Sequence, residues 1–218
     1  MASPSDAAEA ALLRLAAALG APGGTGVDSA LERAAHVAPA VAVEELLLQA
    51  HLFCGYPRVL DAFARWRRLC PEPPAGPEAD AADWPARGEH VCARVYGPYY
   101  AKLRENVRAL HPDLDRWMVT DGYGKVLGRP GLSLVERELA NVALLAAQGA
   151  EPQLHSHLRG ALRVGAAPGR VTSALAAARA EAPAHADAAD RIWARVCSAS
   201  ALPPPGVGVD QGGGTSCS

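Results

Sequence analysis

The segment from residue 128 to residue 165 predicts two consecutive helices joined by a short turn, and this hairpin constrains the fold more than any other part of the chain. Ser133 and Glu136 have the S-x-x-E spacing of a capping box, so a helix should begin at Ser133. It should end near Gly149, because glycine readily takes the left-handed conformation that closes a helix. Pro152 suits the first turn of a second helix, which should end near Gly165.

Each predicted helix carries one ionisable residue on an otherwise apolar face. On the first helix, Glu138 falls within a stripe of apolar side chains, whereas Arg137 lies off that stripe. On the second helix, His157 lies inside the apolar arc and His155 points the other way. Glu138 lies eleven residues before Gly149 and His157 eight residues after it. At a rise of about 1.5 Å per residue, the two side chains should stand at similar heights in an antiparallel pair.

A carboxylate within an apolar face either takes up a proton or is held ionised by a partner such as His157. Both states suit proton transfer near neutral pH. The same pair could instead be a buried structural contact that fixes the register of the two helices without any chemistry. Periodicity does not separate these two interpretations.

The hairpin sequence resembles the core motif of the carboxymuconolactone decarboxylase family, which includes the alkylhydroperoxidase D-like proteins. The family pattern is a glutamate, a histidine nineteen residues later and then small residues ending in glycine. The residues that fill it here are Glu138, His157, Gly160, Ala161 and Gly165. Residues 121–132 resemble the family's lead-in, and residues 43–63 resemble its glutamine-bearing helix. The resemblance implies an all-α, alkylhydroperoxidase D-like helical bundle that assembles into a homo-oligomer.

The sequence departs from the peroxidase branch of that family, in which a C-x-x-C pair lies between the glutamate and the histidine. The matching positions here are Ala150 and Gln153. No two of the chain's five cysteines are closer than sixteen residues; they are Cys54, Cys70, Cys92, Cys197 and Cys217. A dithiol cycle needs a resolving thiol beside the attacking one, so we expect no peroxidase activity of that type. The chain resembles the decarboxylase branch more closely.

The order of the two motifs predicts an internal duplication. In the family the glutamine-bearing helix normally follows the Glu–His hairpin, whereas here it precedes it. Two degenerate copies fused in one chain would explain this order, with residues 31–34 aligned on residues 158–161. We therefore expect four segments: a degenerate N-terminal repeat with the glutamine-bearing helix (1–70), a Pro/Ala/acid linker (71–86), a C-terminal repeat with the Glu–His hairpin (87–200) and a disordered tail (201–218).

Helix-period patterns recur along the rest of the chain, and alternating strand patterns are nearly absent. The chain has 218 residues, of which 50% are hydrophobic, so it can bury a full core. We expect an all-α fold. The further predicted helices cover residues 6–19, 28–38, 43–54, 57–69, 87–110, 113–126, 169–179 and 184–197, and the glycine-rich residues 121–124 are expected to form a turn.

Charge and hydropathy exclude several classes of partner. The net charge is −2, the pI is about 6.4 and the chain has two lysines, so we expect no nucleic-acid binding. The longest apolar runs fall far short of a membrane span, and the acidic start of the chain argues against a secretory signal. Five widely spread cysteines suit a reducing compartment, so we expect a cytoplasmic protein.

Arg129, Gln49 and His51 are the candidates for holding a substrate carboxylate. Arg129 precedes the Glu138 helix at a place where helix-dipole and amide donors favour anions, although it could instead cap a neighbouring helix. Gln49 matches the family's glutamine, although a glutamine there could simply be solvated. His51 lies at the edge of an apolar face, where a core position is the favoured interpretation.

The resemblance implies acid–base chemistry without a cofactor on a small carboxylated lactone or keto acid. In this hypothesis His157 moves the proton, and Glu138 sets its tautomer or acts as a second proton carrier. No metal site is expected, because His155 and His157 face apart on a helix and no third ligand stands nearby. Two alternatives stay open: a non-catalytic oligomeric scaffold or partner-binding module, and a peroxide-handling protein that uses Cys54 alone, although a lone helical cysteine is more often an inert buried thiol.

Overall fold

The computed structural model describes residues 4–72 and 81–200, and all regular secondary structure in these ranges is helical, without a strand. The all-α prediction is therefore confirmed. The α-helices are α1 (Pro4–Gly20), α2 (Val27–Val37), α3 (Ala40–Leu69), α4 (Trp84–Tyr96), α5 (Tyr100–Leu110), α6 (Pro112–Trp117), α7 (Leu134–Gln148), α8 (Glu151–Arg163), α9 (Pro168–Glu181) and α10 (Ala186–Ala199). Short 3₁₀ turns occupy η1 (Pro22–Gly24), η2 (Ala81–Asp83), η3 (Gly97–Tyr99) and η5 (Pro183–His185), and η4 (Met118–Leu127) is a π-helix.

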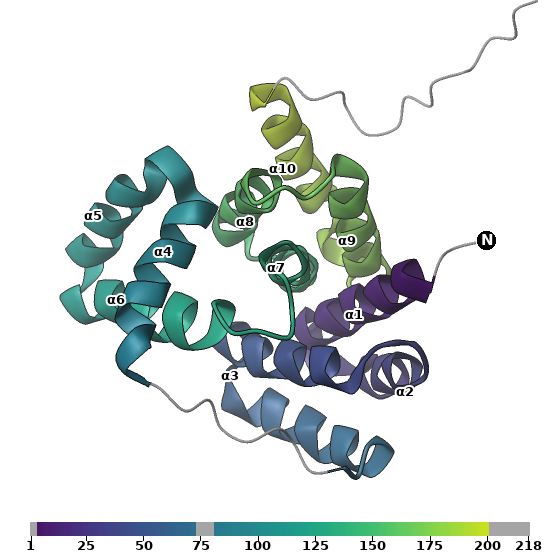
Figure 1. Ribbon diagram of the computed structural model, residues 1–218. Coiled ribbons are helices and arrows are strands. Elements are labelled where there is room, and N and C mark those ends of the chain that lie inside the picture. The colour runs from purple at the N-terminus through teal and green to yellow at the C-terminus, as the bar shows by residue number, and fades with distance from the viewer. Residues whose placement is uncertain (1–3, 73–80, 201–218) are drawn as a thin grey trace, which may run out of the picture.

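Helix α7 lies at the centre of the molecule. Figure 1 looks down its axis, with α1, α8 and α9 arranged around it. Every residue from Arg137 to Ala147 is buried, which is the pattern of a helix covered on all sides. The main hydrophobic core surrounds α7 and takes side chains from α1, α2 and α3 as well as from α8, α9 and α10.

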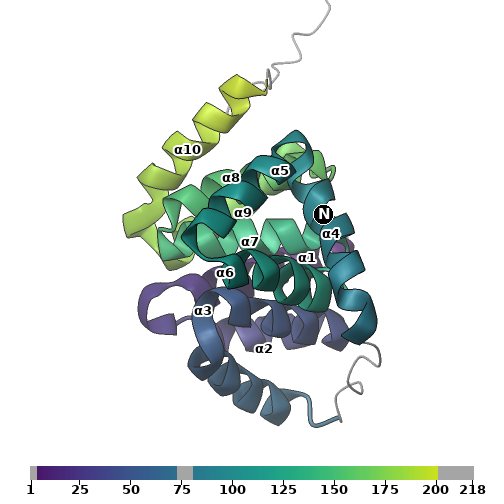
Figure 2. The same cartoon turned by 90° about the vertical axis from the view of Figure 1, so that its left-hand side faces the viewer.

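A second, smaller core lies beside the hairpin of α7 and α8. It joins Val91, Cys92 and Val95 of α4 to Tyr123 and Leu127 of η4. Figure 1 shows α4, α5 and α6 on this side, and Figure 2 shows the second half of α3 along the bottom of the molecule. The Glu–His hairpin is therefore held between a large core and a small one.

Glycines interrupt the helices at two places, one of which the sequence predicts. The predicted helix over residues 87–110 breaks into α4 and α5 at Gly97, which has a φ of 54° and is followed by Pro98. The two predicted helices at 43–54 and 57–69 are the two arms of α3, which breaks at Gly55 (φ 74°, ψ 167°) as the sequence predicts. Both φ angles lie in the left-handed region that favours glycine.

The predicted helix at 113–126 is also divided, into α6 and η4, and the turn predicted at residues 121–124 is wrong. These residues lie inside η4, where Gly124 allows the backbone of α4 to approach closely. A Cβ atom on Gly124 would stand 2.0 Å from the carbonyl oxygen of Trp84. The packing of α4 on η4 therefore favours continued helix over a turn.

The linker predicted at 71–86 is wrong at its C-terminal end, because η2 begins at Ala81 and α4 at Trp84. Residues 73–80 and the tail predicted at 201–218 lie outside the described residues. The segments predicted as two repeats contribute to one common core, and their origin by duplication stays a prediction. Among the described helices, none is long and apolar enough to cross a lipid bilayer.

Candidate functional site

The helical hairpin begins and turns as its local sequence predicts. Ser133 caps α7: its hydroxyl accepts a hydrogen bond from the backbone of Glu136 (3.3 Å), and the Glu136 carboxylate accepts one from the backbone of Ser133 (2.7 Å). Gly149 ends α7 in the left-handed conformation, and Pro152 lies in the first turn of α8. These local signals fix where each arm of the hairpin starts, and hence the relative heights of its side chains.

The hairpin brings Glu138 and His157 into direct contact. His157 Nδ1 and Glu138 Oε2 are 2.8 Å apart, and the two residues are 7% and 0% exposed, respectively. Asn141, one turn further along α7, donates from Nδ2 to Glu138 Oε1 (3.3 Å). Both carboxylate oxygens of Glu138 therefore have a partner, which is what a buried carboxylate requires.

The carboxylate of Glu138 rests against a glycine of the facing helix. A Cβ atom built on Gly160 would lie 2.7 Å from Glu138 Oε2 and 2.7 Å from a methyl group of Val95. Gly160 thus leaves the space that the carboxylate occupies. The small residue at this position is a requirement of the Glu138–His157 contact, because the close approach of α8 to Glu138 leaves no room for a side chain there.

Arg137 is the main correction to the sequence-based picture of the site. The periodicity placed it off the apolar stripe, yet it is 0% exposed. Its guanidinium donates from Nη1 to Gln49 Oε1 (3.1 Å) and from Nη2 to Glu45 Oε2 (2.8 Å). Nη2 also reaches the backbone oxygens of Arg129 and Pro130, each at 3.0 Å. The prediction that Arg137 faces away from the core is wrong, because α7 has no solvent-exposed face between Arg137 and Ala147.

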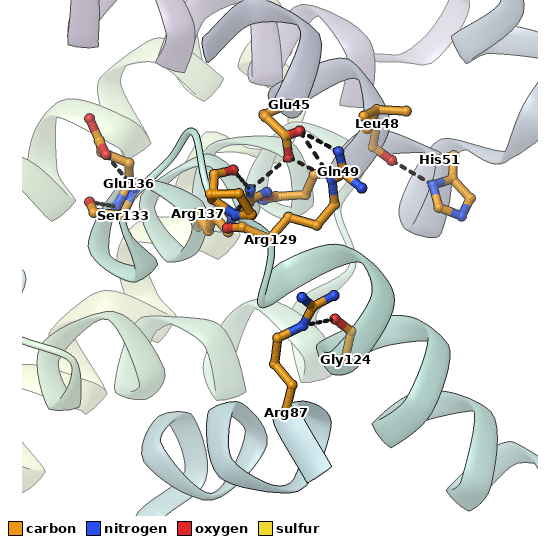
Figure 3. A network of polar contacts seen from close by, with 11 residues as sticks. Glu45, Leu48, Gln49, His51, Arg87, Gly124, Arg129, Ser133, Glu136 and Arg137 are labelled. Atoms are coloured by element: carbon orange, nitrogen blue, oxygen red, sulfur yellow. Dashed lines mark hydrogen bonds and ion pairs between the residues drawn. The ribbon is translucent and has the colours of Figure 1, made fainter. Parts of the chain in front are cut away.

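Glu45 lies between two arginines, as Figure 3 shows. Arg129 binds both of its carboxylate oxygens at 2.9 to 3.0 Å, and Arg137 binds Oε2. Burial lowers the pKa of the Arg137 guanidinium from its ordinary value, and the hydrogen bond to Glu45 acts in the opposite direction. Arg137 Nε is buried and has no hydrogen-bond partner among the residues that the structure describes. The ion pair with Glu45 therefore compensates the burial of Arg137.

Gln49 links this ion-pair cluster to the Glu138–His157 pair. Its Nε2 donates to Asn141 Oδ1 (2.6 Å) and to the backbone oxygen of Arg137 (2.9 Å). Gln49 is 1% exposed, so the alternative of a solvated glutamine is wrong. A continuous line of hydrogen bonds thus runs from Arg137 through Gln49, Asn141 and Glu138 to His157.

The line of hydrogen bonds has one direction. A guanidinium has donors and no acceptor, so the Gln49 oxygen must face Arg137 and its amino group must face Asn141. The Asn141 oxygen accepts that bond, and its amino group is left to donate to Glu138. An ionised Glu138 accepts at Oε2 and so assigns the proton of neutral His157 to Nδ1 and the lone pair to Nε2; Asn141 Nδ2 also lies 3.4 Å from Nδ1.

The Nε2 atom of His157 is the reactive position that this geometry leaves open. Within residues 4–72 and 81–200, Nε2 makes no hydrogen bond. It is also not fully buried in these ranges. The ring meets Phe53 edge-on, with centroids 5.9 Å apart. The site therefore presents one imidazole nitrogen, on a residue that is 7% exposed and is oriented by a buried carboxylate.

The other predicted site residues occupy different surroundings. Arg129 lies near the site, but its guanidinium forms an ion pair with Glu45. Its backbone oxygen accepts a hydrogen bond from Arg137. His51 contacts its own helix, with Nδ1 2.5 Å from the backbone oxygen of Leu48, and its ring meets that of Tyr56. Figure 3 shows this contact of His51 with Leu48.

Cys54 has the surroundings of an unreactive thiol. Its Sγ donates to the backbone oxygen of Leu19 (3.3 Å), and burial raises its pKa to about 11, with Arg58 acting in the opposite direction.

In the part of the chain that the structure describes, no three His, Cys, Asp or Glu side chains are grouped so as to hold a metal ion.

Sequence reasoning missed three residues of the site: Glu45, Arg137 and Asn141. A usable signal was their spacing. Glu45 and Gln49 are four residues apart on one helix, and Arg137 and Asn141 are four apart on another, so each pair lies on one face. Two polar pairs at that spacing, on helices that are otherwise apolar, indicate a buried polar interface between the two helices.

Comparison with known proteins identifies relatives of this chain. The model of the carboxymuconolactone decarboxylase family matches residues 112–194, which include α7 and α8. "Peroxisomal protein 2" of Schizosaccharomyces pombe is 30% identical over 152 residues, which cover 66% of this chain and 71% of that protein. No solved structure matches the chain.

Proposed function

This chain belongs to the carboxymuconolactone decarboxylase family, and we propose that it catalyses cofactor-free acid–base chemistry on a small carboxylated lactone or keto acid. The observation that carries the proposal is the anchored imidazole. Glu138 holds His157 Nδ1 at 2.8 Å, and His157 Nε2 stays without a protein partner within the described residues. An imidazole fixed in one tautomer by a carboxylate is a general acid–base group suited to neutral pH.

The proposed step is a decarboxylation in which His157 supplies the proton. The bond between the carboxylate carbon and its neighbour breaks, CO₂ leaves, and the electron pair moves onto the conjugated carbonyl oxygen of the substrate. His157, protonated at Nε2 by solvent, then gives that proton to the carbon. Glu138 stabilises the imidazolium in the meantime, because it is a hydrogen-bonded carboxylate beside the developing positive charge. One proton is consumed for each CO₂ released.

The residues predicted to hold the substrate carboxylate take different parts in this proposal. Gln49 and Arg129 are already engaged by Asn141 and Glu45, so we assign them to positioning of the site. Gln49 orients Asn141 and, through it, Glu138. His51 keeps its proposed role as a substrate contact.

The alternative is a non-catalytic scaffold of the same fold. The complete burial of Glu138 favours it, because a buried ion pair can fix helix register without any chemistry. The second alternative, peroxide handling by Cys54, is disfavoured by the raised pKa of that thiol, since the thiolate is the nucleophile.

Assembly and location are part of the proposal. We expect a homo-oligomer, supported by exposed apolar side chains on α3 (Val41, Leu48, Tyr56 and Leu60), and light scattering after gel filtration measures its mass. We also expect a cytoplasmic location, which rests on the dispersed cysteines. The name of the S. pombe relative describes a peroxisomal protein, so imaging of the tagged chain in cells distinguishes the two compartments.

The decisive experiment measures CO₂ release from a panel of small keto acids and carboxylated lactones. His157→Asn should lower turnover by about 10²- to 10⁴-fold, the range that a general acid–base group contributes. His90→Asn is the matched control, because His90 is exposed on α4 and should leave turnover unchanged.

Two further readouts separate chemistry from structure. Glu138→Gln should shift the pH profile of turnover, because it removes the carboxylate that stabilises the imidazolium. Thermal melting of both variants reports their stability independently. Unaltered turnover in His157→Asn, together with a large fall in melting temperature, would show that the pair is structural and would reject the proposal.

A further inference from the structure

A basic pocket lies on the other side of α8 from Glu138, between that helix and the segment that joins α4 to α5. Figure 1 shows α4 and α5 beside α8 at this place. The pocket has a volume of about 200 Å³. Three cationic side chains, Lys102, Arg159 and Arg163, line it together with His155 and two tyrosines, and no acidic side chain of the described segments does so. Its lining therefore favours a negatively charged occupant.

Two arginines of this pocket share one aromatic ring. The guanidinium carbons of Arg159 and Arg163 lie 4.4 and 5.0 Å from the centroid of the Tyr99 ring. Stacking on an aromatic face orients a guanidinium and leaves the donors along its edge available. The two guanidiniums over the Tyr99 ring therefore offer two sets of N–H donors at neighbouring positions.

Neither arginine has a carboxylate partner within residues 4–72 and 81–200. Arg163 donates to the backbone oxygen of Val95 (3.3 Å), and both side chains are half-buried. Two other half-buried arginines do have such partners, since Arg104 pairs with Asp115 and Arg170 pairs with Glu9, whereas Arg58 donates to the backbone oxygens of Leu19 and Ala21. Charged side chains that lose solvent are normally paired, so these two arginines leave a charge uncompensated at this pocket.

The charges in the pocket also repel one another. Arg159 and Arg163 are four residues apart on α8 and therefore neighbours on its surface. Burial, followed by the charge of Arg159, lowers the pKa of Arg163. The same two causes lower the pKa of His155. The charge of Arg195 lowers it further. An anion bound between these groups would relieve the repulsion.

From this geometry we infer that the pocket binds a small oxyanion, the carboxylate or phosphate group of an organic ligand, between Arg159 and Arg163. Guanidinium groups match the paired oxygens of both anions and bind them with charge-assisted hydrogen bonds. The Tyr99 ring lies against both guanidiniums, and Lys102 also lines the pocket, with its ammonium paired to Glu105. This site does not depend on the chemistry proposed at His157.

The test is an NMR titration of the isotope-labelled full chain at constant ionic strength. Inorganic phosphate is the probe in one arm and succinate in the other. Signals of the Arg159 and Arg163 side chains should move first, with a dissociation constant of about 1 mM or lower for at least one anion. Binding of phosphate alone identifies a phosphate ester as the ligand class, and binding of succinate alone identifies a carboxylate.

The double variant Arg159→Gln/Arg163→Gln should weaken binding at least about tenfold. Arg33→Gln/Arg68→Gln is the charge-matched control, since both residues are exposed on α2 and α3, and it should bind as the unaltered chain does. Equal weakening in the two double variants, or no movement of the Arg159 and Arg163 signals with either anion, would overturn the inference. The second observation uses the unaltered chain and so does not depend on the folding of any variant.

Discussion

Replacement of Arg137 by methionine tests the central claim that a buried hydrogen-bond network holds the site. Methionine keeps the length and most of the apolar volume of the side chain and removes every donor. Three acceptors then lose their partner inside the protein: Gln49 Oε1 and the backbone oxygens of Arg129 and Pro130. Glu45 keeps the bonds from Arg129.

The expected loss of stability follows from that count. A buried acceptor left without a donor costs about 1 kcal/mol or more, so three of them cost about 3 kcal/mol. Removing one partner of a buried ion pair costs about 3–5 kcal/mol in general. We expect the lower end here, because Glu45 keeps Arg129 and because the burial that lowers the pKa of Arg137 is itself relieved. For a chain of this size, about 3 kcal/mol corresponds to a fall in melting temperature of about 6–12 °C.

Urea unfolding followed by circular dichroism measures this change directly. Arg170→Met is the matched control, because the Arg170 side chain is 39% exposed in its pair with Glu9 and such pairs contribute about 0–1 kcal/mol. If Arg137→Met costs no more than the control, the network does not stabilise the fold and the reasoning from buried acceptors is refuted.

Four further predictions concern single side chains. Nitrogen NMR shifts should show neutral His157 protonated at Nδ1, and the Nε2-protonated form in the unaltered chain would contradict the network direction. Gly160→Ala should lower the melting temperature despite a gain of about 1 kcal/mol in helix propensity, because the new methyl group meets Glu138; a higher melting temperature would contradict this. Cys54 should react slowly with thiol reagents at neutral pH and faster as the pH rises toward its pKa of about 11, whereas rapid reaction at pH 7 would refute the buried environment. Hydrogen bonding to Arg104 lowers the pKa of Asp115, so its contribution to stability is present above the ordinary carboxyl pKa and is lost as the pH falls through the lowered value; Asp115→Asn should flatten the acid limb of the stability curve, and an unchanged slope would count against it.

Local sequence determined the helical class and the geometry of the hairpin. The capping box at Ser133, the left-handed Gly149 and Pro152 act within a few residues of the helix ends that they define. The relative heights of Glu138 and His157 follow from helix rise alone once those ends are known. For this reason the sequence alone predicts that the two side chains meet.

The sequence by itself could not place Arg137, Gln49 and Glu45. Periodicity assigns a helix one apolar and one polar face, and it fails for a helix such as α7 that neighbours cover on all sides. The partners of Arg137 lie 88 and 92 residues away along the chain, on α3. Only the packing of α3 on α7 decides that these polar groups meet each other instead of water. The sequence therefore determined the helices and the Glu138–His157 pair, and the tertiary structure determined the buried network that orients it, because hydrogen bonds between distant segments exist only after those segments have packed together.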